Sequence, residues 1–101
     1  MPELCRVTDD LTTGHLCTTI TQIGSSNTDN SVIANGLPAI VIGAPTVVHT
    51  NPPVPLCPNH VANLNAGSNR VFINGIGVGR VTDSADAGAM IEGSPDVFCG
   101  P

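Results

Sequence analysis

The stretch Asn69-Arg-Val-Phe-Ile-Asn-Gly75 decides the fold, because the chain contains it more than once. An earlier copy, Asn30-Ser-Val-Ile-Ala-Asn-Gly36, lies 39 residues upstream. Each copy runs three strand-forming residues into Asn-Gly, the strongest short-range signal for a β-hairpin. A shortened third copy, Gly93-Ser-Pro-Asp-Val-Phe98, repeats the segment Gly67-Ser-Asn-Arg-Val-Phe72. The repetition predicts an all-β fold that reuses one small unit.

The rest of the chain also favours short strands over helices. Nine prolines and eleven glycines among 101 residues oppose helix throughout. We predict hairpins over Val32–Ile42 and Val71–Val81, a strand over Leu16–Ile23, and a last β-unit over Ala89–Cys99. The proline-rich segment Pro45–Pro58 is interpreted as an ordered crossover.

The length and composition indicate a single domain over residues 1–101 with a small, unusual core. The chain is 41% hydrophobic, yet Phe72 and Phe98 are its only aromatic residues apart from histidine. Valine, isoleucine, alanine and glycine must therefore fill the interior. Such a core suits thin, tightly wound β-structure better than a broad globule.

The charge balance excludes several classes of partner. The chain has no lysine, and three arginines face eight acidic residues for a net charge of −5. Nucleic-acid binding needs a basic stripe, so we expect none, and an anionic membrane surface would repel the chain. The N-terminal residues Met1–Asp9 do not form a secretory signal, and no apolar run is long enough for a membrane helix. We therefore expect synthesis in the cytoplasm, with any export by another route.

Three histidines and four cysteines are the residues that could carry chemistry. His15 precedes a predicted strand, His49 and His60 flank the proline-rich segment, and Cys57-Pro-Asn-His60 has a spacing at which two side chains can share one ion. Three imidazoles and one thiolate form a tetrahedral set that zinc accepts, and iron can occupy similar sites. Two other interpretations remain: scattered structural residues, or a disulfide framework, which a reducing cytosol disfavours.

Motifs of enzymes are weak or missing. Gly75-Ile-Gly-Val-Gly79 faintly resembles a dinucleotide fingerprint, but no helix is predicted after it, and alternating glycines suit a strand pressed against another backbone. The pairs Asp9–Asp10 and Asp83 with Asp86 are interpreted as turn residues rather than acid/base pairs. The sequence therefore predicts a protein that is not an enzyme.

The order and spacing of these motifs resemble the PAAR family, the spike-tip proteins of type VI secretion systems and contractile phage tails. The resemblance covers nearly the whole chain. It is carried by Thr8-Asp9, Thr13-Gly-His15, Ser31-Val-Ile-Ala-Asn-Gly-Leu-Pro-Ala39, His49, Cys57-Pro-Asn-His60, Gly67-Ser-Asn-Arg-Val-Phe-Ile-Asn-Gly75, Gly79-Arg-Val-Thr-Asp83 and Gly93-Ser-Pro-Asp-Val-Phe98.

The resemblance implies a cone of short β-hairpins with pseudo-threefold repeats and one metal ion near the vertex. Family members hold this ion with three histidines and a cysteine, and His15, His49 and His60 fall at the histidine positions. Many members have Cys-Gly where this chain has Ala87-Gly88. We expect Cys99 to be the fourth ligand and Cys57 to be the alternative, with zinc or iron as the metal.

The resemblance also implies a function. The tip would cap a trimeric β-helical spike, one tip per trimer, and sharpen it to pierce a membrane in which it does not reside. The chain resembles a bare tip without an effector extension, assembled into a virion tail or a secretion spike and delivered outside the cell or into a target. Two alternatives are a small metal-dependent hydrolase, which would keep an open position on its ion, and a metal-responsive binding module, which would lose and regain the ion reversibly.

Overall fold

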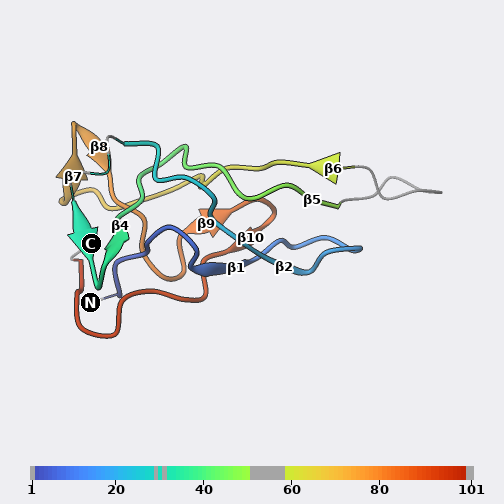
Figure 1. Cartoon of the computed structure of the whole chain (residues 1–101), viewed down its shortest axis with the longest axis horizontal. Helices are drawn as coiled ribbons and strands as arrows, with labels where there is room; N and C mark the ends of the chain where they lie inside the picture. Colours follow the sequence, from blue (N-terminus) through green and yellow to red (C-terminus); the bar gives the residue numbers. More distant parts are fainter. Residues whose placement is uncertain (1, 29, 31, 51–58, 100–101) are drawn as a thin grey trace.

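The computed structural model describes residues 2–28, 30, 32–50 and 59–99. Within these residues ten short strands form five antiparallel two-stranded hairpins, and no helix occurs (Figure 1). No described segment therefore forms a helix that could cross a membrane. The all-β prediction is confirmed.

The five hairpins follow one another along the chain, and each pairs two consecutive strands. They are β1 (Asp10–Thr12) with β2 (Ile20–Gln22), β3 (Ile33–Ala34) with β4 (Leu37–Pro38), β5 (His49–Thr50) with β6 (Asn59–His60), β7 (Phe72–Ile73) with β8 (Ile76–Gly77), and β9 (Ser84–Ala85) with β10 (Gly88–Ala89).

Both Asn-Gly pairs form the predicted turns. Asn35 and Gly36 connect β3 to β4 with φ angles of 54° and 79°, and Asn74 and Gly75 connect β7 to β8 with φ angles of 53° and 80°. Two successive positive φ angles define the tight turn whose twist matches that of the flanking strands. Glycine and asparagine tolerate this backbone better than other residues.

Three extended stretches that are distant in sequence meet through a closed ring of backbone hydrogen bonds. Cys5 N–H donates to the Gly79 carbonyl (2.9 Å), Gly79 N–H donates to the Ile40 carbonyl (2.8 Å), and Ile40 N–H donates to the Cys5 carbonyl (3.3 Å). Each stretch thus contacts both of the others. The ring compensates for the shortness of the individual hairpins, which would be marginal alone.

Two further sets of three backbone hydrogen bonds repeat this relation around the ring. In the first set, the donors are the residues immediately before Cys5, Ile40 and Gly79 in the sequence. In the second set, they are the residues two positions after these three. All six bonds are 2.9–3.0 Å long. The bonds run from Leu4, Ala39 and Val78 to the carbonyls of Val97, Val32 and Val71, and from Val7, Ile42 and Val81 to the carbonyls of Pro38, Gly77 and Glu3.

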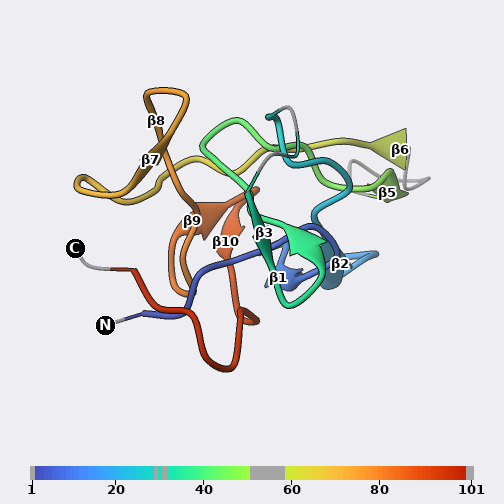
Figure 2. The same cartoon turned by 60° about the vertical axis from the view of Figure 1, so that its left-hand side comes forward.

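The third copy of the repeat is completed by the beginning of the chain. We predicted a last β-unit over Ala89–Cys99, and the structure shows that this segment pairs with the N-terminal residues. Glu3 forms an antiparallel bridge with Phe98, and Cys99 N–H donates to the Pro2 carbonyl (2.9 Å). The described segments near the two termini accordingly lie close together in Figures 1 and 2. The N-terminal segment supplies the second strand that the shortened copy lacks.

The proline-rich segment is also corrected in part. Its flanks do not cross over, because β5 and β6 pair with His49 opposite His60. Residues 51–58, including Cys57, lie outside the described residues.

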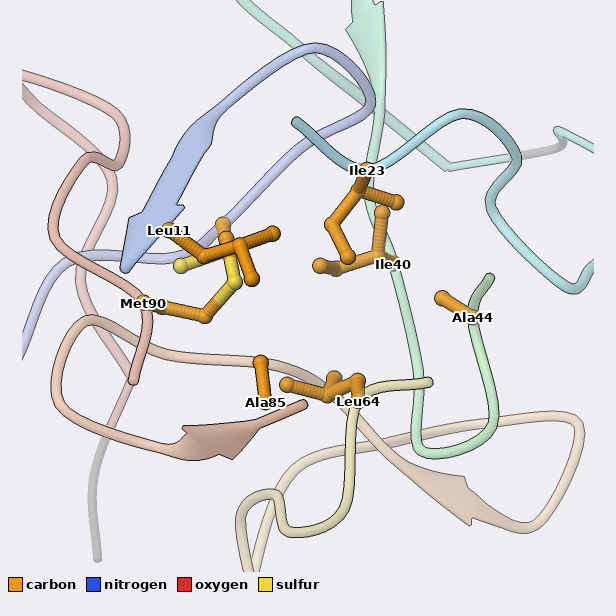
Figure 3. Close-up of a cluster of buried hydrophobic side chains, with 8 residues drawn as sticks. Leu11, Ile23, Ile40, Ala44, Leu64, Ala85 and Met90 are labelled. Carbon is orange, nitrogen blue, oxygen red and sulfur yellow. The ribbon is translucent and has the colours of Figure 1, made fainter. Parts of the chain in front are cut away.

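Two clusters of buried side chains form the interior. The central core includes Cys5 and Ile40 of the ring and is shown in Figure 3. The terminal core includes residues of β3, β7 and the segments near both chain ends. The central core contains Cys5, Leu11, Ile23, Ile40, Ala44, Leu64, Ala85 and Met90, and the terminal core contains Leu4, Ala34, Ala39, Val41, Ile73, Val78 and Cys99. Both phenylalanines are exposed, so aliphatic and sulfur-containing side chains fill the interior.

Gly79 shows how tightly the ring is packed. A Cβ at this position would lie 2.7 Å from Leu64 Cδ2 and 3.0 Å from Ile40 Cγ1. Both neighbours belong to the central core, and protein interiors have little free volume. The absence of a side chain at Gly79 therefore makes room for the larger side chain of Ile40 in the same ring.

The hairpins point in two directions from the ring. The terminal end contains β3–β4, β7–β8 and both chain ends, and the opposite end contains the outer parts of β1–β2 and β5–β6 (Figure 1). We call the second the histidine end, because all three histidines belong to these two hairpins.

Candidate metal centre

Three hairpins bring four side chains with metal-binding atoms together at the histidine end. His15 comes from the loop between β1 and β2, His49 and His60 come from β5 and β6, and Asp86 comes from the turn between β9 and β10. One ligand atom from each residue lies within 4.8 Å of those of the other three. The three predicted histidines are therefore brought together.

Local backbone structure places each histidine. His49 and His60 face each other because they are register partners in β5–β6. His15 follows Gly14, which has a φ of 75° and lies so close to the Ala87 carbonyl that a Cβ would overlap it. Ala87 N–H donates to the Thr13 carbonyl (2.9 Å), which holds this loop against the β9–β10 turn.

Asp86 lies at the middle of the cluster. Its Oδ2 is 2.9 Å from Nε2 of both His15 and His49, and its Oδ1 is 3.4 Å from Nε2 of His60. The Asp86 amide donates to the Asn63 carbonyl (3.1 Å), and the Asn65 side chain donates to the Asp86 carbonyl (2.9 Å). Asn63 and Asn65, which follow β6 in the sequence, thus hold the β9–β10 turn in place.

The hydrogen bonds on the outer side of two rings determine which nitrogen faces the cluster. Nδ1 of His15 lies 3.0 Å from the Leu16 carbonyl, and Nδ1 of His49 lies 3.0 Å from the Val47 carbonyl. A carbonyl can only accept, so each Nδ1 carries the proton. In the neutral rings both Nε2 lone pairs then point at the Asp86 carboxylate, which is itself an acceptor. This arrangement requires a cation, either a metal ion or added protons.

The electrostatics of the metal-free cluster agree with this requirement. Burial opposes ionisation of Asp86, yet hydrogen bonds from the three histidines hold the pKa of its carboxyl below the usual value. Burial likewise disfavours a charged His15, but the Leu16 carbonyl and the Asp86 carboxylate together raise its pKa. The site therefore favours positive charge beside a permanent negative charge.

The four side chains differ in burial. The His49 side chain is 2% exposed and that of Asp86 is 7% exposed, whereas the His60 side chain is 28% exposed. Solvent therefore reaches the cluster mainly on the side of His60. An ion could enter there while the other three donors stay in place.

The donor set fits a divalent transition metal. Imidazole nitrogen suits zinc, iron, copper and nickel, and carboxylate oxygen also binds zinc at ordinary distances. When bound, the ion would add a further link among the three hairpins at this end. Among the described residues the set lacks a thiolate. Its donor atoms are therefore chemically harder, that is, less polarisable, than those of the three-histidine, one-cysteine set that we expected.

Cys99 does not join the histidines, which corrects our expectation for the fourth ligand. It is 3% exposed and belongs to the terminal core, where Ala34 and Ile73 occupy the corresponding places beside their own Asn-Gly turns. Burial raises the pKa of its thiol, which disfavours the thiolate that a metal needs. Cys99 lies away from the histidines because its backbone N–H donates to the Pro2 carbonyl, which holds this segment at the terminal end.

The three cysteines that the structure describes are of two kinds. Cys5 and Cys99 are free and buried, whereas Cys17 is disulfide-bonded. Our argument against disulfides is therefore wrong for Cys17. The alternative ligand Cys57 lies outside the described residues.

Asp86 is the member of the site that sequence reasoning missed. We interpreted it as a turn residue, and it does occupy a turn, with a φ of 53°. A signal was present, because Asp86 immediately precedes Ala87-Gly88, the dipeptide that stands where many of the PAAR proteins that the sequence resembles have Cys-Gly. A ligand-capable side chain one position earlier could have been considered.

Comparison with protein-family models found no match, and comparison with curated proteins found none either.

Proposed function

We propose that this chain is a PAAR-like structural tip, a small cone with pseudo-threefold repeats that caps a trimeric β-helical spike. The metal lies near the vertex of this cone, and the terminal end forms its base. The sequence resemblance suggests this role, and one feature of the base supports it best.

The supporting observation is a set of three equivalent apolar side chains on the base. Ile33, Phe72 and Phe98 are 54%, 54% and 48% exposed. Each follows the valine whose carbonyl accepts one of the three repeated hydrogen bonds described above. A folded protein gains nothing from large apolar side chains in water, whereas a threefold partner could cover all three with three copies of one surface.

The closed ring supports the same interpretation. Cys5, Ile40 and Gly79 bond one another in a cycle, so a single chain presents three similar edges without three identical subunits. A trimeric spike offers three matching edges at its blunt end. One such chain per trimer would close the spike and narrow it toward the histidine end.

The metal in this proposal has a structural role. Its four donors come from three different hairpins, so the ion would cross-link these hairpins at the narrow end. We assign the protein to the spike of a contractile machine, either a phage tail or a type VI secretion system, made in the cytoplasm and carried through a membrane by force. No catalytic role is proposed.

Co-purification with a trimeric β-helical spike protein from the same source tests this proposal. We expect one chain per trimer, measured by native mass spectrometry. Ile33→Asp, Phe72→Asp and Phe98→Asp should each weaken the complex at least tenfold, to a similar extent, because burying an unpaired charge is costly. The matched control Val48→Asp, at the histidine end, should leave the complex intact. A different stoichiometry, or loss with the control alone, refutes the capping role.

A further inference from the structure

The histidine end carries almost no formal charge. Residues 11–28 and 30–69 contain no aspartate, glutamate, lysine or arginine, and these two segments include the outer parts of β1–β2 and β5–β6. Asp86, contributed by the β9–β10 turn, is the acid that meets the three histidines, and its side chain is 7% exposed. The other charged residues that the structure describes thus belong to other segments of the chain.

Exposed aliphatic side chains cover the same two hairpins. Leu16 is 73% exposed, Val48 is 62% exposed, Val61 is 50% exposed and Ile20 is 49% exposed. Leu16 and Ile20 belong to the β1–β2 hairpin, while Val48 and Val61 directly flank β5 and β6. Such side chains gain free energy when they leave water.

The two hairpins contact each other. The hydroxyls of Thr18 and Thr50 lie 2.6 Å apart, and the Thr50 amide donates to the Thr18 hydroxyl (3.2 Å). The rings of His15 and His49 stack next to this contact. The exposed aliphatic side chains are therefore carried on a joined support, which Figure 1 shows extending away from the ring.

We propose that this uncharged apolar surface binds lipid bilayers spontaneously, without applied force. Hydrocarbon fits a surface without formal charge, because any partner recognised by charge, such as an anionic lipid headgroup, would require complementary charges here. The net charge of −5 would repel an anionic membrane from the whole molecule, but residues 11–28 and 30–69, which include the exposed aliphatic side chains of this surface, contribute none of it. Binding should therefore depend on apolar area and hardly at all on salt.

The depth of insertion is limited by the backbone. An open two-stranded hairpin has unpaired N–H and C=O groups along its edges, and these groups are costly in hydrocarbon. The surface should consequently rest in the interfacial layer, with Leu16 and Val48 among the acyl chains. Contact of this kind would seat the tip on a membrane before the spike is driven forward.

This inference depends on the proposed function for its biological setting, but vesicles test it separately. The unmodified chain is mixed with phosphatidylcholine vesicles and floated on a density gradient. We expect it to rise with the vesicles, and to the same extent from about 0.05 to about 1 M salt. In Leu16→Trp, the only tryptophan of the chain reports position, and its emission should shift to the blue and be quenched by brominated lipid.

Matched valine substitutions identify the surface responsible. Val48→Thr with Val61→Thr should weaken vesicle partitioning about tenfold or more, since each replaces an apolar methyl by a hydroxyl at nearly constant shape. Val32→Thr with Val71→Thr makes the same change at the terminal end, where these residues are 43% and 38% exposed, and should leave partitioning unchanged. Thermal melting confirms that both double variants are folded.

Several results would overturn the lipid proposal. These are failure of the unmodified chain to float, equal flotation of the Val48/Val61 variant, equal loss in the Val32/Val71 variant, or release by salt. None of them affects spike capping, which is measured on the complex without vesicles. Conversely, a chain that binds vesicles and not the spike would refute capping and leave the lipid surface standing.

Discussion

The imidazole rings of His15 and His49 stack with planes 6° apart, and their Nε2 atoms lie 3.3 Å apart. Nδ1 of each ring lies 3.0 Å from a backbone carbonyl, so in the neutral rings the Nδ1 atoms donate and two Nε2 lone pairs face each other across this gap. The Asp86 carboxylate lies 2.9 Å from both. Three acceptors at these distances repel one another unless a cation joins them, and this relationship is the basis of the first two predictions.

Replacing Asp86 should remove the metal, whereas replacing Cys99 should not. Asp86→Asn keeps the size of the side chain but loses its negative charge. We expect metal affinity to fall by more than the roughly 10- to 100-fold that follows loss of a residue that only supports a ligand. Metal content by mass spectrometry under native conditions measures this.

Cys99→Ser is the control for Asp86→Asn. It places a hydroxyl in the terminal core and should cost about 1–3 kcal/mol of stability while the metal content stays unchanged. If Cys99→Ser empties the site and Asp86→Asn does not, the assignment of the fourth ligand is wrong.

Stability should respond to pH in opposite directions with and without metal. In the metal-free protein the raised pKa of His15 stabilises the fold below the unfolded value of 6.5, and this contribution is lost as pH rises through the folded pKa. The lowered pKa of Asp86 stabilises the fold above 3.8 and is lost as pH falls through its folded pKa. The metal-free chain should thus be more stable at about pH 5.5 than at about pH 8.

The metal-loaded protein should show the reverse, because protons compete with the ion for neutral imidazole. Thermal melting at the two pH values, with zinc and with a chelator, gives both slopes. Parallel slopes would mean that the ion does not bind the histidines.

Gly79→Ala should destabilise the protein by about 1–3 kcal/mol, because the added methyl overlaps Leu64 and Ile40 in the central core. Ile40→Val removes one methyl from the crowded side. The double variant should therefore be more stable than the sum of the two single effects implies, which a double-mutant cycle of urea melts detects. Simple additivity would show that the methyl is accommodated elsewhere.

Arg6→Val should destabilise the protein more than Arg6→Val combined with Asp9→Ala. Arg6 bonds the Asp9 carboxylate at 2.8 and 2.9 Å, and the Asp9 side chain is 2% exposed. The single change leaves a buried carboxylate without its charged partner, although the backbone N–H of residue 6 still donates to it (2.7 Å), and loss of such a partner typically costs about 3–5 kcal/mol. In the stretch that contains Ile40, Val41 stands at the position equivalent to Arg6 and Ala44 at the position equivalent to Asp9. An apolar pair is therefore compatible with this backbone.

Urea melts of the two Arg6 variants give the comparison. Greater loss in the double variant would show that the carboxylate is satisfied by other groups when Arg6 is removed.

Much of the fold could be predicted because its signals are local. Asn35-Gly36 and Asn74-Gly75 require positive φ at both positions, and few other dipeptides permit it. The pairing of Phe98 with Glu3 had no such signal. It joins residues at opposite ends of the chain, and nothing in either segment indicates the other.

The candidate site divides in the same way. The three histidines could be identified because imidazoles are rare in this chain and bind metals strongly. The fourth donor could not, because Asp86 and Cys99 are both plausible ligands in plausible turns.

The sequence by itself determined the short hairpins, the aliphatic interior and the histidine ligands, since turn geometry, apolar content and donor chemistry belong to individual residues. Only the tertiary structure decided that Asp86 meets the histidines, that Cys99 is buried at the other end, and that the two chain ends complete the third unit. These outcomes depend on the direction in which each hairpin leaves the ring of Cys5, Ile40 and Gly79, and that direction is set by hydrogen bonds between segments far apart in the chain.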